Sequence, residues 1–498
     1  MRFSEVEDLR SRLLIFIREE RKYLLLLILI FSLGFMLRMA HTAGSPYLVN
    51  GIDGPYYVSQ INFLYETGES LHKDSPLTFY YLLVWRYITG DTVRAIKVGM
   101  SVITGLICFP IYFLVRRITQ DRDAAIFSAF LGIFNPYLFS MTYNLYKNEL
   151  GILLMLTFFV LFFRFLSTDG IRNKWRELLL LMLVLVTIWG THIMATGMTV
   201  LFAGSYLFLA FFRDKNTARR ALRLLLVLGA IGGCFLIILA AVFPAAFYKV
   251  YKLQFLSDLF EDESDAPRFS PEDDDQENPF AVFLVKNLDP VKWFGFPALI
   301  GIIPLLYRVF RGENLPGELF ILSTYFSWLV FVQPSVSREL IWRFSLASFV
   351  PVSLAAGYGL SAIKRRCPLL LAIPVIALVL GLSFIEASAV ARHARTTVTE
   401  AEYLEIVEMR DVMPDVEYSI AGLGGNPYWY EVVLEQKIIR SHYIDEEGLR
   451  TNPVVVIESK RPTRPWRVPK EKPWLRKADV IWDGTHLKAY LLPPRPAS

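Results

Sequence analysis

The stretch Asn50-Gly51-Ile52-Asp53-Gly54-Pro55-Tyr56-Tyr57-Val58-Ser59-Gln60 places one carboxylate, Asp53, beside two tyrosines, shortly after the first long apolar segment of the chain. Gly54-Pro55 indicates a turn, because glycine tolerates unusual backbone angles and proline restricts both its own φ and the residue before it. A single aspartate in such a turn is often a helix cap or a solvated side chain. The function of Asp53 therefore has to be judged from the topology around it.

The composition indicates a membrane protein. Of the 498 residues, 54% are hydrophobic, the mean hydropathy is +0.39, and runs such as Tyr23–Leu37 and Leu178–Val186 are typical of spanning helices. Residues 1–22 are basic and lead directly into a full-length span, so we expect them to remain as a cytoplasmic N-terminal segment. The cysteines lie in or beside predicted spans, which argues against a disulfide framework.

The positions of the lysines and arginines predict the topology, because cytoplasmic loops retain these residues. Basic clusters recur in residues 1–22, at 116–122, 164–176, 213–223, 308–311 and 364–366. They predict about 11 spans, with the N-terminus inside and the C-terminus outside. The spans are expected near residues 23–40, 98–115, 124–143, 150–166, 177–191, 193–212, 222–247, 293–307, 317–333, 344–363 and 368–389. The transmembrane part is thus residues 23–390.

The first outer loop, residues 41–97, is expected to form a structured platform that carries Asp53. Its apolar and aromatic segment Ser75–Arg86 is too short to cross the membrane, and we predict an interfacial helix there. Another outer loop, Tyr248–Lys292, carries blocks of acidic residues that repel one another. We predict a solvated loop, with a lid over a lipid-filled cleft and a mere spacer as open alternatives.

Three short polar segments at outer span boundaries supply further candidate residues. Lys147-Asn148-Glu149 is expected to form a short loop between two apolar spans, where it is either functional or simply at a helix end. His192 lies in an almost loopless turn and is either a packing residue or a functional one. Arg338 and Arg343 flank the start of a span and need an anionic partner, for which a lipid phosphate is suitable.

The last part of the chain, residues 391–498, is predicted to be a small exported α/β domain. Thr399–Val412 is typical of a helix, and short strands are expected near residues 418–423, 437–440, 454–458, 479–482 and 488–492. The basic, proline-rich segment Ser459–Lys477 indicates a surface loop rather than a nucleic-acid contact.

Together these features resemble the GT-C superfamily of integral-membrane glycosyltransferases, which includes oligosaccharyltransferases, protein O-mannosyltransferases and lipid A aminoarabinose transferases. The segment Asp53–Gln60 is similar to the first-loop acidic motif of archaeal oligosaccharyltransferases, whereas their acceptor-reading Trp-Trp-Asp-Tyr-Gly motif is absent. Asn426–Glu431 lies in a comparable domain without the aspartate of that motif. The resemblance implies a multi-pass cell-membrane protein, prokaryotic and archaeal-like, with its active site on the extracytoplasmic face.

The resemblance also implies a polyprenyl-phosphate-linked sugar donor and a protein, lipid or glycan acceptor. On this hypothesis Asp53 is the catalytic base, and the substrate-binding residues are Tyr56, Tyr57, Lys147, Asn148, Glu149, His192, Arg338 and Arg343. Monosaccharide transfer fits better than en bloc transfer of an oligosaccharide. A transporter or flippase of lipid-linked sugar and a non-catalytic subunit remain alternatives.

A divalent metal is a further possibility at this stage. Asp53 and Glu149 could hold Mn²⁺ or Mg²⁺ through their carboxylate oxygens. Lys147, adjacent to Glu149, could supply the positive charge instead. We therefore expect no obligatory metal cofactor.

Overall fold

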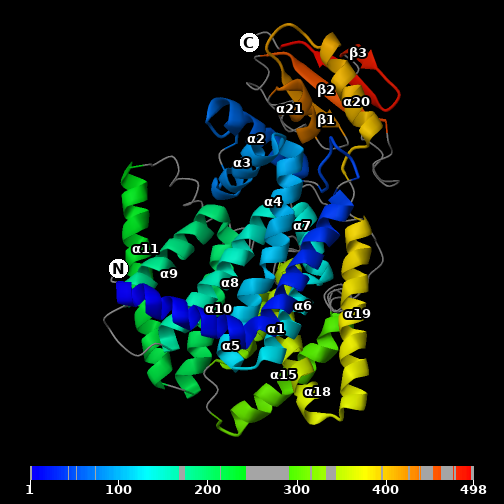
Figure 1. The fold of residues 1–498 in the computed structure, drawn as a ribbon. Helices are drawn as coiled ribbons and strands as arrows, with labels where there is room; N and C mark the ends of the chain where they lie inside the picture. Colours follow the sequence, from blue (N-terminus) through cyan, green and yellow to red (C-terminus); the bar gives the residue numbers. More distant parts are fainter. Residues whose placement is uncertain are drawn as a thin grey trace, which may run out of the picture. The chain divides into compact units, whose positions relative to one another are not determined.

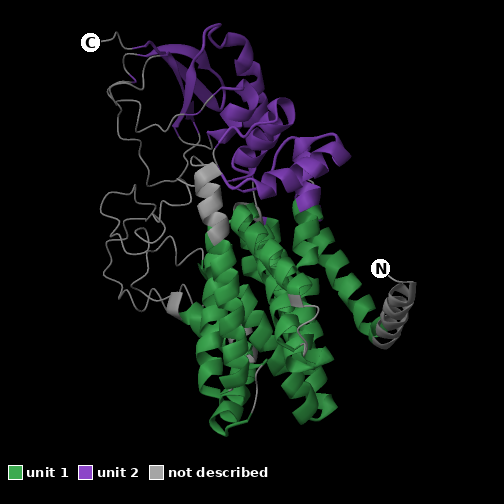
Figure 2. Ribbon diagram, turned by 90° about the vertical axis from the view of Figure 1, so that its left-hand side faces the viewer, with its two compact units in different colours: residues 1–39, 100–392 green, residues 40–99, 393–498 purple. Residues whose placement is uncertain are grey.

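The computed structural model describes residues 3–42, 44–51, 53–72, 74–167, 174–213, 215–242, 291–313, 317–331, 344–393, 396–423, 427–436, 438, 452–460, 475 and 478–494. The acidic segment predicted to be a lid or spacer, apart from residues 291–292, lies outside these residues, as do Arg338 and Arg343. The chain divides into two compact units (Figure 2). Unit 1 comprises Met1–Met39 and Met100–Arg392, and unit 2 comprises Ala40–Gly99 and His393–Ser498.

Unit 1 is built from helices (Figure 1). Its described helices are α1 Phe3–Thr42, α4 Thr92–Leu106, α5 Cys108–Thr119, α6 Arg122–Ile133, α7 Pro136–Asn144, α8 Tyr146–Ser167, α9 Lys174–Thr191, α10 Ile193–Arg213, α11 Lys215–Val242, α15 Val291–Phe310, α16 Leu319–Phe331, α18 Phe349–Arg366 and α19 Leu369–His393. Three of them, α1, α4 and α19, include residues of unit 2 at one end. The helical segment is interrupted at Asn135-Pro136, where the Asn135 side chain caps α7 by accepting from the Tyr137 N–H.

Each of the eleven predicted spans has a helix in its described part. Within the described residues, seven segments are long and apolar enough to cross a membrane: Glu20–Thr42, Thr92–Thr119, Arg122–Met141, Tyr146–Ser167, Ile193–Arg213, Phe344–Arg366 and Leu369–His393. The remaining four predicted spans correspond to α9, α11, α15 and α16. The protein is therefore a multi-pass membrane protein, and its total of eleven spans stays a prediction.

The core of unit 1 is organised around α18. In the most apolar stretch of the segment Phe344–Arg366, which contains α18, 94% of the residues are buried. In the corresponding stretch of α19 the share is 11%. Small residues allow the helices to approach closely: a Cβ added at Gly301 would overlap the carbonyl oxygen of Ala355, and one added at Gly357 would overlap Ser128. Such small-residue contacts are a common way to pack helices inside a membrane, where the hydrophobic effect does not drive association.

Unit 2 combines two short helices from the first predicted outer loop with a small mixed sheet. The helices are α2 Gly54–Thr67 and α3 Leu77–Thr89, and each ends at a glycine with positive φ, Gly68 at 76° and Gly90 at 73°. This backbone conformation is the usual C-terminal signal of a helix and costs a glycine little. The helix predicted at Ser75–Arg86 is thus present as α3, shifted by a few residues, and its position at the membrane interface stays a prediction.

The turn expected at Gly54-Pro55 is instead the first turn of α2. Proline is well suited to this position, because its fixed φ matches a helix and the N–H that it lacks would have no intrahelical partner. The helix then buries Tyr57, Val58, Ile61 and Leu64. Their helical spacing, rather than the Gly-Pro pair, was the signal that decided the local structure.

The rest of unit 2 contains α20 Glu400–Met409, the 3₁₀ helix η1 Arg410–Val412, α21 Tyr428–Leu434 and four strands, β1 Ser419–Leu423, β2 Val454–Ser459, β3 Asp479–Asp483 and β4 Leu487–Leu492. The sheet order is β1-β2-β4-β3, with β1 and β2 parallel and the other pairs antiparallel. Thr399 and Glu402 form a capping box at the start of α20. Of the strand expected at 437–440 only Ile438 is described, in a bridge to Ile420; α21 was not predicted.

Candidate active site

Asp53 occupies the N-cap position of α2 and is partly buried. Its carbonyl oxygen accepts the N–H of Tyr57 at 3.2 Å, the first hydrogen bond of the helix. The positive end of the helix dipole favours a carboxylate anion at this position. The structure therefore provides a defined place for the side chain that was predicted to act as the base.

One turn after Asp53, Tyr56 lies in an aromatic cluster that we define as Tyr56, Tyr57, His72, Phe79 and Tyr428. The ring of Tyr56 is stacked on His72 at 5.3 Å and meets Tyr428 edge-on at 5.2 Å. Burial raises the pKa of Tyr56 to about 12, although a hydrogen bond with Gln60 acts in the opposite direction. The phenol is therefore protonated at neutral pH and donates to Asp74 Oδ2 at 2.7 Å.

Tyr57, the other tyrosine predicted to contact substrate, is 2% exposed. Its ring packs against Phe79 at 5.4 Å, so it forms part of the interior of unit 2. The aromatic cluster thus has a buried side at Tyr57 and Phe79 and a partly exposed side at Tyr56, His72 and Tyr428. A role for either tyrosine in binding substrate stays a prediction.

A buried carboxylate, Glu431 of α21, lies beside this cluster and was not predicted. Its Oε2 accepts from Ser59 Oγ at 2.9 Å and lies 3.1 Å from His72 Nε2. Gln60 holds His72 in place by bonding both its backbone N–H and its carbonyl oxygen. Within the described residues the second oxygen, Oε1, is buried without a hydrogen-bond partner. No local sequence pattern could have revealed this site, because it joins segments more than 350 residues apart.

In unit 1, the segment Lys147-Asn148-Glu149 is not the short loop that we expected. It forms the first turn of α8, and its side chains are buried, with exposed fractions of 7%, 4% and 0%. The reason lies in tertiary packing: a fully buried glutamate needs a positive partner, and the first span provides one. Arg38 Nη1 donates to Glu149 Oε2 at 2.6 Å.

The surroundings of this ion pair complete a buried arginine cluster, which we define as Arg38, Met100, Thr104, Tyr146 and Glu149. Thr104 Oγ1 donates to Glu149 Oε1 at 2.5 Å. Arg38 Nη1 also lies 2.7 Å from Thr104 Oγ1 and 3.2 Å from the carbonyl oxygen of Met100. The guanidinium carbon is 5.6 Å from the ring centroid of Tyr146. Arg38 was missed at the sequence level, although a charge within an apolar span is itself a signal.

The turn between α9 and α10 lies close to the start of α8. His192 Nδ1 accepts the N–H of Met194 at 3.2 Å and so caps α10. Asn148 Nδ2 contacts the sulfur of Met194 at 3.8 Å. A Cβ added at Gly151 would meet the Cβ atoms of Ala195 and His192. The structure thus brings His192 together with the Lys147–Glu149 segment.

The buried arginine cluster does not have the donor set of a divalent metal site. Both oxygens of Glu149 already accept hydrogen bonds, and the nearest charged group is the cation Arg38. Metal ions in such sites need several free oxygen ligands. Nor does the described part of the chain contain a group of three or more His, Cys, Asp or Glu residues placed to hold a metal.

Comparisons with known proteins agree with this architecture. A family model described as a family of unknown function, DUF6541, matches residues 83–306. No curated protein matches the sequence. Solved structures are similar in fold: the oligosaccharyltransferase AglB from Archaeoglobus fulgidus, in complex with an inhibitory peptide and a dolichol-phosphate, has a TM-score of 0.61 at 14% identity.

The match to AglB covers 85% of this chain and 64% of that protein, so the chain spans slightly less than two thirds of the length of this relative. An Archaeoglobus fulgidus oligosaccharyltransferase in complex with Zn and sulfate matches with a TM-score of 0.61 at 16% identity, over 83% of this chain and 62% of that one. ArnT from Cupriavidus metallidurans, bound to undecaprenyl phosphate, matches with a TM-score of 0.62 at 10% identity, over 94% of this chain and 98% of that one.

The chain therefore shares the fold of AglB and ArnT, in agreement with the fold that the resemblance to the GT-C superfamily implied. ArnT is one of the solved structures with this fold, and the match extends along almost the whole of both chains.

Proposed function

We propose that this protein is a glycosyltransferase that takes a sugar from a polyprenyl-phosphate donor at the extracytoplasmic face and transfers it to a hydroxyl-bearing acceptor. The observation that carries the proposal is the GT-C fold, shared over 94% of the chain with a protein solved in complex with undecaprenyl phosphate. A carboxylate at the N-terminus of α2, beside partly exposed aromatic rings, supports it further.

The chemistry required of the protein is limited. In the proposed reaction the acceptor oxygen forms a bond to the anomeric carbon of the sugar, and the bond from that carbon to the phosphate oxygen breaks. The acceptor proton moves to Asp53, and the polyprenyl phosphate leaves with its electron pair. General base catalysis of this kind contributes typically about 10²- to 10⁴-fold in rate.

The departing phosphate carries negative charge, which we propose is held by Arg338 and Arg343. Arginine binds phosphate in a bidentate manner and stabilises charge that develops as the bond breaks. Tyr56 would stack on a sugar or acceptor group, while Lys147, Asn148 and His192 would orient the donor. Glu149 acts through Arg38 and is thus a positioning residue. No step is assigned to a metal.

The substitution Asp53→Asn tests the proposal directly, because it removes the base while keeping the size of the side chain. Membranes that contain the variant are supplied with lipid-linked sugar, and transfer of label is measured. We expect the rate to fall by about 10²- to 10⁴-fold. Asp91→Asn is the matched control, since Asp91 in the same unit accepts the N–H of Arg94 at 2.7 Å, and an asparagine can do the same. Transfer by Asp53→Asn at the wild-type rate would remove Asp53 from catalysis.

A further inference from the structure

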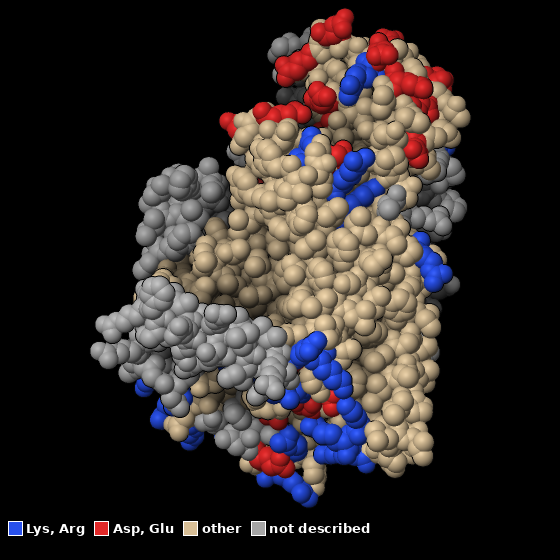
Figure 3. All heavy atoms as spheres, viewed as in Figure 1, with Lys and Arg blue, Asp and Glu red and all other residues tan. Residues whose placement is uncertain are grey.

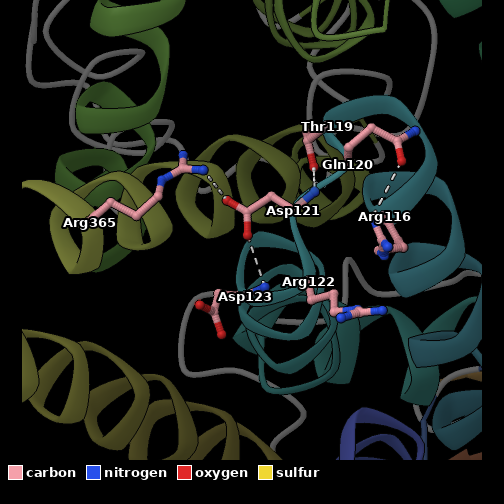
Figure 4. Close-up of a pocket in the computed structure, with 7 residues that line it drawn as sticks. All are labelled: Arg116, Thr119, Gln120, Asp121, Arg122, Asp123 and Arg365. Carbon is pink, nitrogen blue, oxygen red and sulfur yellow. Dashed lines mark hydrogen bonds and ion pairs between the residues drawn. The ribbon is translucent and has the colours of Figure 1, made fainter. Parts of the chain in front are cut away.

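A polar cavity of about 340 Å³ lies in unit 1, at the junction of α5 and α6 and beside the end of α18. Its lining contains no apolar residue type and consists of Arg116, Thr119, Gln120, Asp121, Arg122, Asp123 and Arg365. Figure 4 shows these side chains around the turn between α5 and α6, with Arg365 reaching toward Asp121. None of them belongs to the proposed active site.

The backbone of this turn is held firmly. Gln120 has a positive φ of 56° and ends α5, and its side chain donates to the carbonyl oxygen of Arg117 at 2.7 Å. Asp121 caps α6 by accepting the N–H groups of Asp123 and Ala124. Its other oxygen accepts from Ser361 at 2.5 Å and pairs with Arg365 at 2.8 Å. The walls of the cavity are therefore formed before any ligand binds.

The charges on the walls are unevenly matched. Glu20, which is 4% exposed, is shared between Arg122 at 2.8 Å and Arg116 at 3.6 Å, and its second oxygen accepts from Tyr112. The other polar contact of Arg116, with Gln120 Oε1, is 3.4 Å long. One carboxylate thus serves two guanidinium groups, and among the described residues the Arg116 side chain makes only long polar contacts. Asp121 and Asp123 on the same wall pair with Arg365 at 2.8 Å and Lys364 at 2.6 Å. The described residues at this site thus include four cationic side chains and three carboxylates, which leaves one positive charge in excess.

The position of the cavity suggests the source of a ligand. It lies at the end of unit 1 where Lys364, Arg365 and Arg366 follow one another at the end of α18 and where Arg116 and Arg117 end α5. Figure 3 shows Lys and Arg side chains gathered at this end, with mostly uncharged side chains along the middle of the unit. Basic residues at the ends of spans favour the cytoplasmic leaflet and attract anionic lipid headgroups.

We propose that this cavity is a binding site for a phosphate ester, separate from the proposed active site. Arg116 and Arg122 would hold the phosphate oxygens, since arginine suits phosphate geometry. Gln120 and Thr119 would form hydrogen bonds with hydroxyl groups of the ester, since Asp121 already uses both carboxylate oxygens. A hydroxylated phosphate headgroup of the adjacent leaflet, or a soluble phosphate ester with the same groups, has this chemistry.

Two probes distinguish the sources. The full-length protein is purified and its thermal unfolding is followed with increasing glycerol 3-phosphate, and separately in nanodiscs of phosphatidylcholine with and without phosphatidylglycerol. A ligand that binds the folded state raises the unfolding temperature in a saturable manner. A shift with both probes supports a general phosphate-ester site, and a shift with phosphatidylglycerol alone supports a lipid site. Absence of any saturable shift with either probe overturns the proposal.

The variant Arg116→Gln tests which residues are responsible. Glu20 keeps Arg122 and Tyr112 in this variant, so the fold should be retained, which its unfolding temperature without ligand checks. We expect its affinity for the effective probe to fall about ten-fold or more, as for loss of a charge-assisted hydrogen bond. Arg213→Gln is the control, because Arg213 also ends a helix, α10, and is exposed away from the cavity lining. Equal losses in both variants would show that net charge alone matters and would overturn the site.

Discussion

Arg38 and Glu149, which are 111 residues apart in the sequence, form an ion pair of 2.6 Å in the interior of unit 1. Their side chains are 2% and 0% exposed, so neither charge is solvated. A buried pair adds little net stability, but loss of one partner leaves an uncompensated charge. This relationship links the first span to the residues that we expected to act in a loop.

We predict that Glu149→Ala destabilises the protein by about 3–5 kcal/mol, because Arg38 would remain buried without its carboxylate. The double variant Arg38→Met/Glu149→Leu should recover most of this loss. Thermal unfolding of the purified protein in detergent measures both. Glu177→Ala is the control: Glu177 pairs with an Arg164 side chain that is 58% exposed, and such pairs are worth about 0–1 kcal/mol. If Glu149→Ala and Glu177→Ala are equally stable, the buried pair has no structural role.

We predict that transfer activity persists after removal of divalent cations. The reason is that Arg38 and Thr104 occupy both oxygens of Glu149, the residue considered as a metal ligand. Sugar transfer is measured in membranes before and after treatment with a chelator, and again after addition of Mn²⁺ or Mg²⁺. Activity that is abolished by the chelator and restored by either cation would contradict this prediction.

A third prediction separates the two possible roles of His192. Its ring caps α10 by accepting the Met194 N–H, and asparagine is among the best residues for this task. We expect His192→Asn to keep the unfolding temperature of the wild type but to lose transfer activity, because the imidazole is needed to orient the donor. His192→Ala should lose both, with a cap worth about 1 kcal/mol. Full activity in His192→Asn would leave His192 with a structural role alone.

A fourth prediction concerns the packing of α15 against α18. We expect Gly301→Ala to destabilise the protein by about 1–3 kcal/mol, as overpacking generally does, because the new methyl group would overlap the Ala355 carbonyl oxygen. The control Gly204→Ala adds the same group to α10 where nothing lies within 4 Å, and the higher helix propensity of alanine should make it neutral or slightly stabilising. Unfolding temperatures that rank the two variants in the opposite order would show that the helices separate easily.

Much of the fold could be predicted because it depends on local features of the sequence. Apolar length and basic clusters located helices at every predicted span, since the cost of placing charges in lipid acts on each segment separately. The helix predicted at Thr399–Val412 is present as α20 and η1, and the capping box that starts it is also local, because Thr399 and Glu402 lie within one turn. The strands near 418–423, 454–458, 479–482 and 488–492 were found from their apolar pattern, and the structure has β1 to β4 there.

The candidate site was predicted less completely, because its contacts join distant segments. Sequence reasoning selected Lys147, Asn148, Glu149 and His192, and the structure brings these residues together, but it also buries the first three. It did not select Arg38 or Glu431, whose importance follows from their partners. Similarly, Gly54-Pro55 is compatible with both a turn and a helix start, and only the burial of Tyr57 and Leu64 decided for the helix.

The sequence by itself therefore determined that the protein is a membrane protein, where the helices of its predicted spans lie, and which polar segments interrupt them. These properties follow from transfer free energies and capping bonds that act over a few residues. Only the tertiary structure decided which charges meet, as Arg38 meets Glu149 and Arg116 meets Glu20. The physical reason is that the partner of a buried charge is chosen by the packing of whole helices, and the residues that compete for that partner are far apart along the chain.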